Sequence, residues 1–196
     1  MGKVFHVDHQ IANKNVEDSI TECTKVVKYS DINSENRLFG GQLMSWIDEV
    51  AGVVAVRHSG NPVATAAVDN MQFKQGAKLD DIIVIIGKLT YVGKTSMEVR
   101  VDTYVEDRRN GMRHIMNRAY FTEVCIDEDD TPVLVPYGLN VRTESEKAEW
   151  EGALKRRELR RQRRMEMHDR PHISSLQCLL IISLAQEGQY HSVSAE

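Results

Sequence analysis

Cysteine is scarce in this chain of 196 residues, and its spacing is irregular. The three cysteines, Cys23, Cys125 and Cys178, are odd in number and far apart, and no Cys-x-x-Cys pair occurs. Structural zinc sites and disulfide frameworks both need cysteines at short or regular spacing. The composition therefore indicates neither, and a reducing, cytoplasmic setting is the default expectation.

Long apolar runs are also missing. A membrane-spanning helix needs about 18 or more consecutive apolar residues, and no stretch of that kind is present. Residues 1–6 lead into no apolar run, so we expect no signal peptide. The net charge of -4 argues against a general nucleic-acid binder. Hydrophobic content of 41% and charged content of 28% suit a globular protein with one domain and an appendage.

One apolar stretch, residues 39–56, predicts a long helix. Its apolar residues recur at helical spacing in two adjacent stripes. The stripes are Leu43, Ile47, Val50 and Val54, and Met44, Ala51 and Ala55. A helix that is apolar on nearly every face is expected to be buried rather than laid on a surface. Asp48 lies inside this run and Gly40 and Gly41 lie at its start, so we expect chemistry there.

Strand character appears on both sides of this helix. The segments are rich in β-branched residues or alternate between apolar and polar side chains. They cover residues 19–29, 63–73, 82–91, 97–105 and 114–126, and residues 132–135 end the sheet. Short polar turns join most of them, which is typical of an antiparallel meander. The prediction is an α+β fold with a curved antiparallel sheet around one long helix. Residues 82–86 are continuously apolar and need cover on both faces, so we expect at least a dimer.

Charge dominates after residue 143. Residues 144–167 predict a charged helix, and residues 153–164 are strongly basic. A solvated helix and a patch for nucleic acid or an acidic partner both fit this pattern. No aromatic residue lies between the arginines to stack on bases, so we expect a solvated helix and no nucleic acid. The expected divisions are an arm over 1–17, a domain over 18–143, a charged helical extension over 144–170 and a tail of unknown role over 171–196.

Several spaced motifs occur in a fixed order along the chain. They are Asn33, Phe39 to Gly41, Trp46 to Gly52, Arg57 with His58, Val68 to Phe73, Tyr91 to Val99 and Asn117 to Phe121. Together they resemble the cytosolic acyl-CoA thioesterases of the hotdog fold, and the resemblance covers about residues 19–155.

The resemblance implies a central helix wrapped by an antiparallel sheet. It also implies a dimer with one continuous sheet, with dimers often assembled into hexamers. The family reaction is hydrolysis of a fatty acyl-CoA thioester to free acid and coenzyme A, in the cytoplasm, with no metal and no cofactor besides the coenzyme A of the substrate. The chain shows no metal-ligand spacing, which agrees with that expectation.

Asp48 is the active carboxylate that the resemblance implies. Glu49, one position along and about 100° round the helix, is the rival by spacing alone. The apolar neighbours Ile47 and Val50 predict that Asp48 is buried, which raises a carboxyl pKa, whereas a nearby donor lowers it. Direct attack on the carbonyl and activation of a water are both open roles for Asp48.

Gly40 and Gly41 let a substrate oxygen approach the free amides at the helix start, where the helix dipole favours negative charge. A glycine-rich start chosen for packing is the alternative. Asp48 lies seven residues after Gly41, which is roughly 10 Å along a helix. Since one carbonyl cannot easily touch both, we expect these glycines of one subunit to face Asp48 of another.

Asn33 is the partner residue that the resemblance implies, because a side-chain amide can donate to the carbonyl or hold the attacking water. A turn or cap role also fits an asparagine there, and Asn36 is close enough to be confused with it. The coenzyme A handle is expected at a glycine turn and nearby cations. These candidates are Arg57, Lys74, Gly93, Lys94, Thr95, Ser96 and Arg118, with an ordinary hairpin turn as the alternative for residues 93–96. The acyl chain is expected near Met44, Trp46 and Met71.

The sequence allows three other interpretations. His58 is a catalytic base in principle, but it fits a cation at the helix C-terminus better. A hotdog dehydratase of acyl thioesters typically uses a histidine in the loop before the helix, and residues 31–39 contain none. A non-catalytic acyl-CoA-binding regulatory module needs no carboxylate at the carbonyl, so Asp48 favours hydrolysis.

Overall fold

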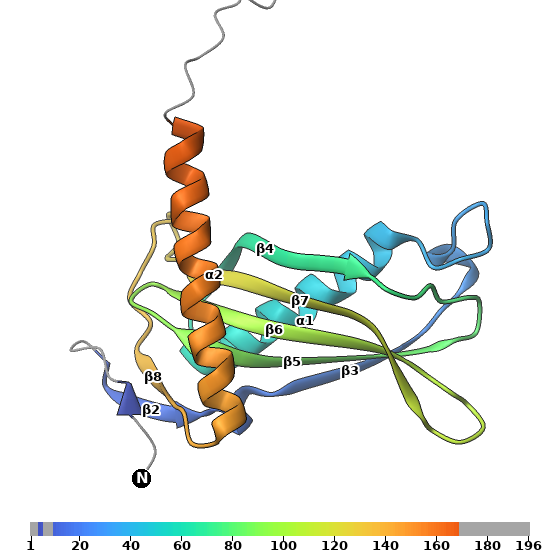
Figure 1. Ribbon diagram of the computed structural model, residues 1–196, viewed down its shortest axis with the longest axis horizontal. Coiled ribbons are helices and arrows are strands. Elements are labelled where there is room, and N and C mark those ends of the chain that lie inside the picture. Colours follow the sequence, from blue (N-terminus) through green and yellow to red (C-terminus); the bar gives the residue numbers. More distant parts are fainter. Residues whose placement is uncertain (1–3, 6–9, 169–196) are drawn as a thin grey trace, which may run out of the picture. The chain divides into compact units, whose positions relative to one another are not determined.

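The computed structural model describes residues 4–5 and 10–168 of the chain, and Figure 1 shows their arrangement. Five strands form one antiparallel sheet in the order β3-β5-β6-β7-β4. They are β3 (Thr21–Val26), β4 (Val63–Phe73), β5 (Ile82–Val92), β6 (Ser96–Glu106) and β7 (Arg113–Cys125). Short turns join β5, β6 and β7, because the chain must reverse between antiparallel neighbours. The predicted α+β hotdog arrangement is confirmed.

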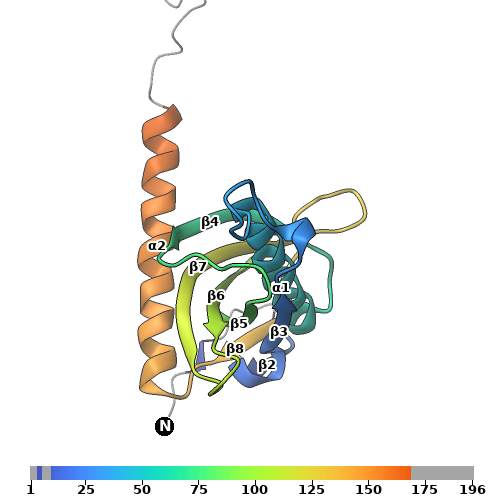
Figure 2. The same cartoon turned by 90° about the vertical axis from the view of Figure 1, so that its right-hand side faces the viewer.

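Helix α1 (Gly40–Ser59) lies along the inner face of this sheet, and Figure 2 shows the strands curving around it. One of its faces is buried. The buried residues are Leu43, Trp46, Ile47, Val50, Ala51, Val54, Ala55, His58 and Ser59. Gly60 ends the helix at φ 73°, a left-handed conformation that favours glycine, and its N–H donates to the Val56 carbonyl at 2.8 Å.

The other face of α1 is open in the single subunit. Met44, Val53 and Val56 are 45%, 42% and 44% exposed. The prediction that the helix is buried on nearly every face was therefore wrong for one subunit, because the sheet covers only one side of it.

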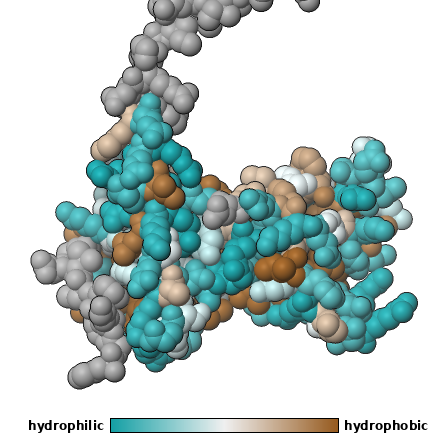
Figure 3. All heavy atoms as spheres, in the orientation of Figure 1, coloured by the Kyte–Doolittle hydropathy of each residue, from teal (hydrophilic) through white to brown (hydrophobic). Residues whose placement is uncertain are grey.

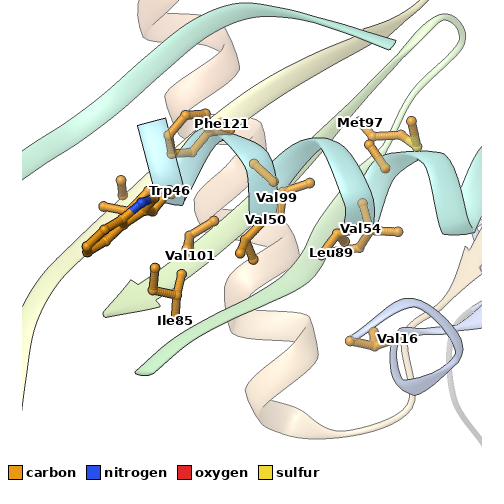
Figure 4. Close-up of a cluster of buried hydrophobic side chains, with 14 of the residues drawn as sticks. Val16, Trp46, Val50, Val54, Ile85, Leu89, Met97, Val99, Val101 and Phe121 are labelled. Atoms are coloured by element: carbon orange, nitrogen blue, oxygen red, sulfur yellow. The ribbon is translucent and has the colours of Figure 1, made fainter. Parts of the chain in front are cut away.

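Gly87 on β5 sets how closely α1 approaches the sheet. A Cβ atom at this position would lie 2.8 Å from Cγ2 of Val54 and 2.9 Å from Cγ1 of Val50. Figure 4 shows Val50 and Val54 of α1 packed against inward-facing side chains of β5, β6 and β7. The helix can pack at this distance because glycine has no side chain.

A second, smaller sheet joins the two ends of the domain sequence. Strand β8 (Tyr137–Asn140) pairs antiparallel with β1 (Val4–Phe5) and parallel with β2 (Ala12–Asn15). The 3₁₀ helices η1 (Val16–Ser19) and η2 (Tyr29–Asp31) flank β3. The sequence predicted a loose arm over 1–17 and the last strand at 132–135. The structure instead places residues 12–15 in a sheet, and it gives Pro132 only an isolated bridge to Ile126.

The outer face of the large sheet is partly covered by the chain itself. Helix α2 (Glu144–His168) begins after β8, and its residues up to Arg156 contact β5, β6 and β7. Trp150 lies against Tyr91 with ring centroids 4.6 Å apart, and the Arg156 guanidinium lies 3.5 Å from the Tyr120 ring centre. Part of the outer face is thus covered by α2, at the end of β5 that carries Tyr91.

Charged side chains fill much of this outer layer. Arg156 donates to Glu98 at 2.7 Å, and the Glu98 side chain is only 2% exposed. Arg100 donates to Asp102 at 2.5 Å and also pairs with Glu149. These ion pairs attach the first half of α2 to the sheet although it carries few apolar residues.

The chain divides into two compact units, Met1–Arg156 and Arg157–Glu196. Within the described part of the second unit, Glu158 accepts hydrogen bonds from Arg161 and Gln162 one turn further along α2. Figure 3 shows that the surface of α2 is mostly hydrophilic. The expected tail over 171–196 lies outside the described residues. None of the helices described is long and apolar enough to cross a membrane.

Gly87→Ala should destabilise the protein by roughly 1–3 kcal/mol, because the added methyl overpacks the contact with Val50 and Val54. The free energy of unfolding in urea measures this. Gly76→Ala is the matched control, since a Cβ there meets only Arg37 at an ordinary 3.7 Å. Equal stability of the two variants would show that the close contact at Gly87 does not limit packing.

Candidate active site

Asp48 lies on the exposed side of α1, beside the edge strand β4. The Thr65 hydroxyl donates to Oδ1 of Asp48 at 2.7 Å. The predicted burial of Asp48 is wrong for the single subunit, because Ile47 and Val50 turn toward the sheet while Asp48 turns away from it. Its rival Glu49 is also exposed and lies 3.8 Å from Nζ of Lys25.

A second carboxyl group, on the inner face of the sheet, contacts the Thr65 hydroxyl. Glu123 on β7 is opposite Thr65 in the β4–β7 register, and its Oε1 lies 3.1 Å from Oγ1 of Thr65. The Glu123 side chain is only 1% exposed. Burial raises the pKa of Glu123 to about 7, the charge of Asp48 adds to this rise, and the Thr65 hydroxyl opposes it.

Neither Thr65 nor Glu123 was singled out from the sequence. The signal that could have found Glu123 is the period-two pattern of β7, where Phe121, Glu123 and Cys125 face inward together. All three are buried. An acid between two inward-facing apolar positions is unusual enough to mark a site.

An apolar pocket of about 250 Å³ opens next to Asp48. It is lined by residues of α1, β4 and β7. These residues are Met44, Ser45, Asp48, Val68, Met71 and Phe121. Met44 and Met71 were expected near the acyl chain and line this pocket, whereas Trp46 is in the core. The carboxylate therefore borders a cavity that suits an apolar chain.

The start of α1 presents free backbone donors. The first helical hydrogen bond runs from the Leu43 N–H to the Phe39 carbonyl at 3.1 Å. The residues described provide no side-chain cap for this end. Gly40 has open space where a Cβ would lie, while a Cβ on Gly41 would meet the Phe39 ring at 2.5 Å. The amides before Leu43 are thus available to an anion.

Asn33 shapes the loop before α1. Its Oδ1 accepts from the backbone N–H groups of Glu35 at 3.0 Å and Arg37 at 3.1 Å. Asn36 adopts φ 55°, a left-handed conformation that asparagine tolerates. The structure thus gives both asparagines a role in the turn. The Asn33 side chain is exposed, and its Nδ2 takes no part in these two hydrogen bonds.

The coenzyme A candidates are not gathered in one place within the subunit. Residues 93–96 form the β5–β6 turn next to the start of β4, whereas Lys74 follows the far end of β4. Arg57 donates to the Thr21 hydroxyl at 2.9 Å. Arg118 lies on the outer face, where it donates to Asp102 at 2.5 Å.

The sequence suggested that His58 is a cation at the end of α1, and the structure shows that it is not. Its side chain is fully buried, and Nε2 lies 3.1 Å from the Tyr137 carbonyl oxygen. Burial lowers the pKa of His58 to about 4, so the ring is neutral at pH 7. The cation at this helix end is Lys14, whose Nζ donates to the His58 carbonyl at 2.7 Å. Within the described ranges, no group of three potential ligand side chains is placed to hold a metal ion.

Comparison with known proteins points to one family. The model of the thioesterase superfamily matches residues 35–112. An uncharacterized acyl-CoA thioester hydrolase of Bacillus subtilis is 37% identical over 118 residues, which are 58% of this chain and 69% of that protein. The cytosolic acyl coenzyme A thioester hydrolase of Rattus norvegicus is 34% identical over 126 residues, covering 62% of this chain and 32% of that longer protein.

Solved structures extend the similarity to the fold. An acyl-CoA hydrolase from Staphylococcus aureus, in complex with butyryl coenzyme A and coenzyme A, superposes with a TM-score of 0.73 at 33% identity, over 79% of this chain and 94% of that one. A hexameric acyl-CoA thioesterase superposes with a TM-score of 0.73 at 35% identity, over 78% of this chain and 97% of that one.

Variants of the Staphylococcus aureus enzyme have an asparagine, an aspartate and a threonine each replaced by alanine. In that chain the aspartate lies 15 residues after the asparagine and 17 residues before the threonine. Asn33, Asp48 and Thr65 have the same two spacings here. Thr65, which contacts Asp48, thus has the same spacing from Asp48 as the threonine replaced in that enzyme.

Glu123→Gln should change how stability depends on pH. The pKa of Glu123 is raised in the folded state, so folding binds a proton between about pH 4.5 and 7, and wild-type stability falls as pH rises through this window. Relative to wild type, the variant should therefore gain about 3 kcal/mol between pH 4.5 and pH 8.

Urea unfolding at the two pH values measures this gain. Met97→Leu is the control, because Met97 is opposite Glu123 on β6 and carries no ionisable group. A stability difference between Glu123→Gln and wild type that is the same at both pH values would contradict the raised pKa.

Proposed function

The chain belongs to the acyl-CoA thioester hydrolases of the thioesterase superfamily, and we propose that it hydrolyses fatty acyl-CoA to free acid and coenzyme A with Asp48 as the reacting carboxylate. The observation that carries the proposal is the position of Asp48. Its carboxylate is held by Thr65 at 2.7 Å and borders an apolar pocket.

Asp48 is proposed to act as a general base. It takes a proton from a water, and the hydroxide attacks the thioester carbonyl. The negative charge on the carbonyl oxygen is stabilised by the backbone N–H groups at the start of α1. The intermediate then expels the coenzyme A thiolate, which takes the proton back from Asp48. These steps use only protein groups and water, so we propose no cofactor.

Asn33 and Thr65 support the reacting groups in this proposal. The exposed Nδ2 of Asn33 donates to the carbonyl or the water, and Thr65 holds Asp48 by its hydroxyl. For the coenzyme A handle, the β5–β6 turn is the preferred candidate, because Lys94 is exposed and its neighbours carry hydroxyl groups. We propose a cytoplasmic location, in line with the cytosolic rat relative.

The site is proposed to lie between two subunits. Asp48 and Gly41 are roughly 10 Å apart along α1, so one carbonyl would meet them on different chains. Strand β4 is an edge of the large sheet and can pair with another copy. Val68 and Phe73 on β4 are 39% and 47% exposed, and Met44 on α1 is 45% exposed. Apolar exposure of this kind suits a dimer interface, and assembly into a hexamer is proposed by analogy with the hexameric structure.

Asp48→Ala should lower kcat about a thousandfold, because the general base is lost. The measurement is thiol release from acyl-CoAs of several chain lengths. Glu49→Ala is the matched control, since Glu49 is the next residue and is also exposed; it should keep near-normal kcat. Binding of acyl-CoA by the wild type without any turnover would instead favour the regulatory module.

Mixed dimers test the shared site. In a dimer of an Asp48→Ala subunit and a Gly41→Pro subunit, one of the two sites combines the intact glycine of the first with the intact aspartate of the second. We expect about half of the wild-type activity per dimer, whereas each variant alone is nearly inactive. Purified mixed dimers that recover no activity would place both groups of each site on one chain.

A further inference from the structure

We propose that Glu123 is a positioning residue for the hydrolysis, which donates a hydrogen bond to Thr65 so that the only hydroxyl proton of Thr65 points at Asp48. This inference rests on the proposed function of Asp48. It extends that site inward by one buried acid, which touches neither the pocket nor any reacting atom.

The hydroxyl of Thr65 has one proton and two carboxyl neighbours. Its Oγ1 lies 2.7 Å from Oδ1 of Asp48 and 3.1 Å from Oε1 of Glu123. A hydroxyl can donate only once, so the second contact needs a proton from the other partner. If both acids were ionised, one carboxylate oxygen would face the lone pairs of Oγ1.

Burial decides which acid carries the extra proton. Asp48 is exposed, whereas Glu123 is 1% exposed. A buried carboxyl group is the costlier one to ionise. The consistent arrangement is a chain of donors from the Glu123 carboxyl to Thr65 and from Thr65 to the Asp48 carboxylate.

The surroundings of Glu123 agree with a neutral acid. Asp48 faces it from α1, Thr65 from β4 and Met97 from β6, while Cys125 is its inward-facing neighbour on β7. Asp48 and Cys125 are the titratable members of this set, and each is negative when ionised. Burial raises the pKa of Cys125, and the charge of Glu123 raises it further. Burial and the charge of Asp48 likewise raise the pKa of Glu123 to about 7.

The donor chain has a consequence for catalysis. While Glu123 is protonated, Thr65 is fixed as a donor to Asp48 and holds that carboxylate in place. When Glu123 loses its proton, it competes for the Thr65 hydroxyl and adds a negative charge near the site where an oxyanion forms. We therefore expect kcat to fall as pH rises through about 7, with little change in KM.

The test compares pH profiles of kcat and KM for the full-length wild type and three variants. Glu123→Gln keeps a donor that cannot ionise, so its kcat at pH 6 should lie within about threefold of wild type and the fall near pH 7 should vanish. Glu123→Leu has no donor, so its kcat should drop at least tenfold with KM nearly unchanged. Cys125→Ala removes the buried thiol beside Glu123 and should keep the fall in kcat.

The proposal is overturned if the fall in kcat near pH 7 persists in Glu123→Gln. It is also overturned if this fall is lost in Cys125→Ala. Infrared difference spectra give a readout that needs neither turnover nor a stable Glu123→Leu variant. A protonated carboxylic acid should be seen in the folded wild type at pH 6, should be lost by pH 8, and should be absent from Glu123→Gln. The absence of that band from the wild type also overturns the proposal.

The same measurements separate a wrong reaction from a wrong role for Glu123. If neither the wild type nor any variant releases thiol, the proposed hydrolysis is wrong, and the infrared band alone reports on Glu123. If Asp48→Ala abolishes turnover while Glu123→Gln retains the wild-type pH profile, the hydrolysis stands and the role of Glu123 is wrong.

Discussion

The close packing of α1 on β5 at Gly87 is the contact on which the rest of the structure depends. Val50 and Val54 occupy the space that any other side chain at position 87 would need. Because interiors are densely packed, a displacement there would be passed along the whole helix. The same helix carries Asp48 and the glycines at its start, so this contact fixes where these proposed reacting groups lie relative to β4 and β7.

This packing divides α1 into two faces with different chemistry. Leu43, Ile47 and Val50 go into the core, and Asp48 is left at the border between the core and the open edge of the sheet. At that border, one hydroxyl on β4 connects an exposed acid to a buried one. Since a low-dielectric interior disfavours charge, the buried Glu123 is the harder of the two acids to ionise. In the proposed mechanism, this difference in ionisation orients the Thr65 hydroxyl toward Asp48.

The outer face of the sheet is stabilised in another way. Arg156 with Glu98, and Arg100 with Asp102, take the place that apolar residues hold on the inner face. Ion pairs of this kind contribute modest net stability because both partners lose water, but removing one partner leaves a buried charge. They account for how the first half of a highly charged helix packs on a sheet while its basic continuation belongs to a separate compact unit.

Local spacing in the sequence predicted a helix over residues 39–56, which the structure has as Gly40–Ser59, and the strands of the large sheet, because helical and strand periods depend only on neighbouring residues. Spacing alone did not separate Asp48 from Glu49, and the choice of Asp48 came from the resemblance to a family. The pairing of residues 12–15 with 137–140 was not predictable in this way, since it joins segments distant in the chain. Whether Asp48 is exposed depended on which face of α1 meets the sheet. The contact of Thr65 with Asp48 and Glu123 depended on the β4–β7 register. Only the tertiary structure decided this strand pairing, the exposure of Asp48 and the contacts of Thr65, because each depends on packing between elements rather than within one element.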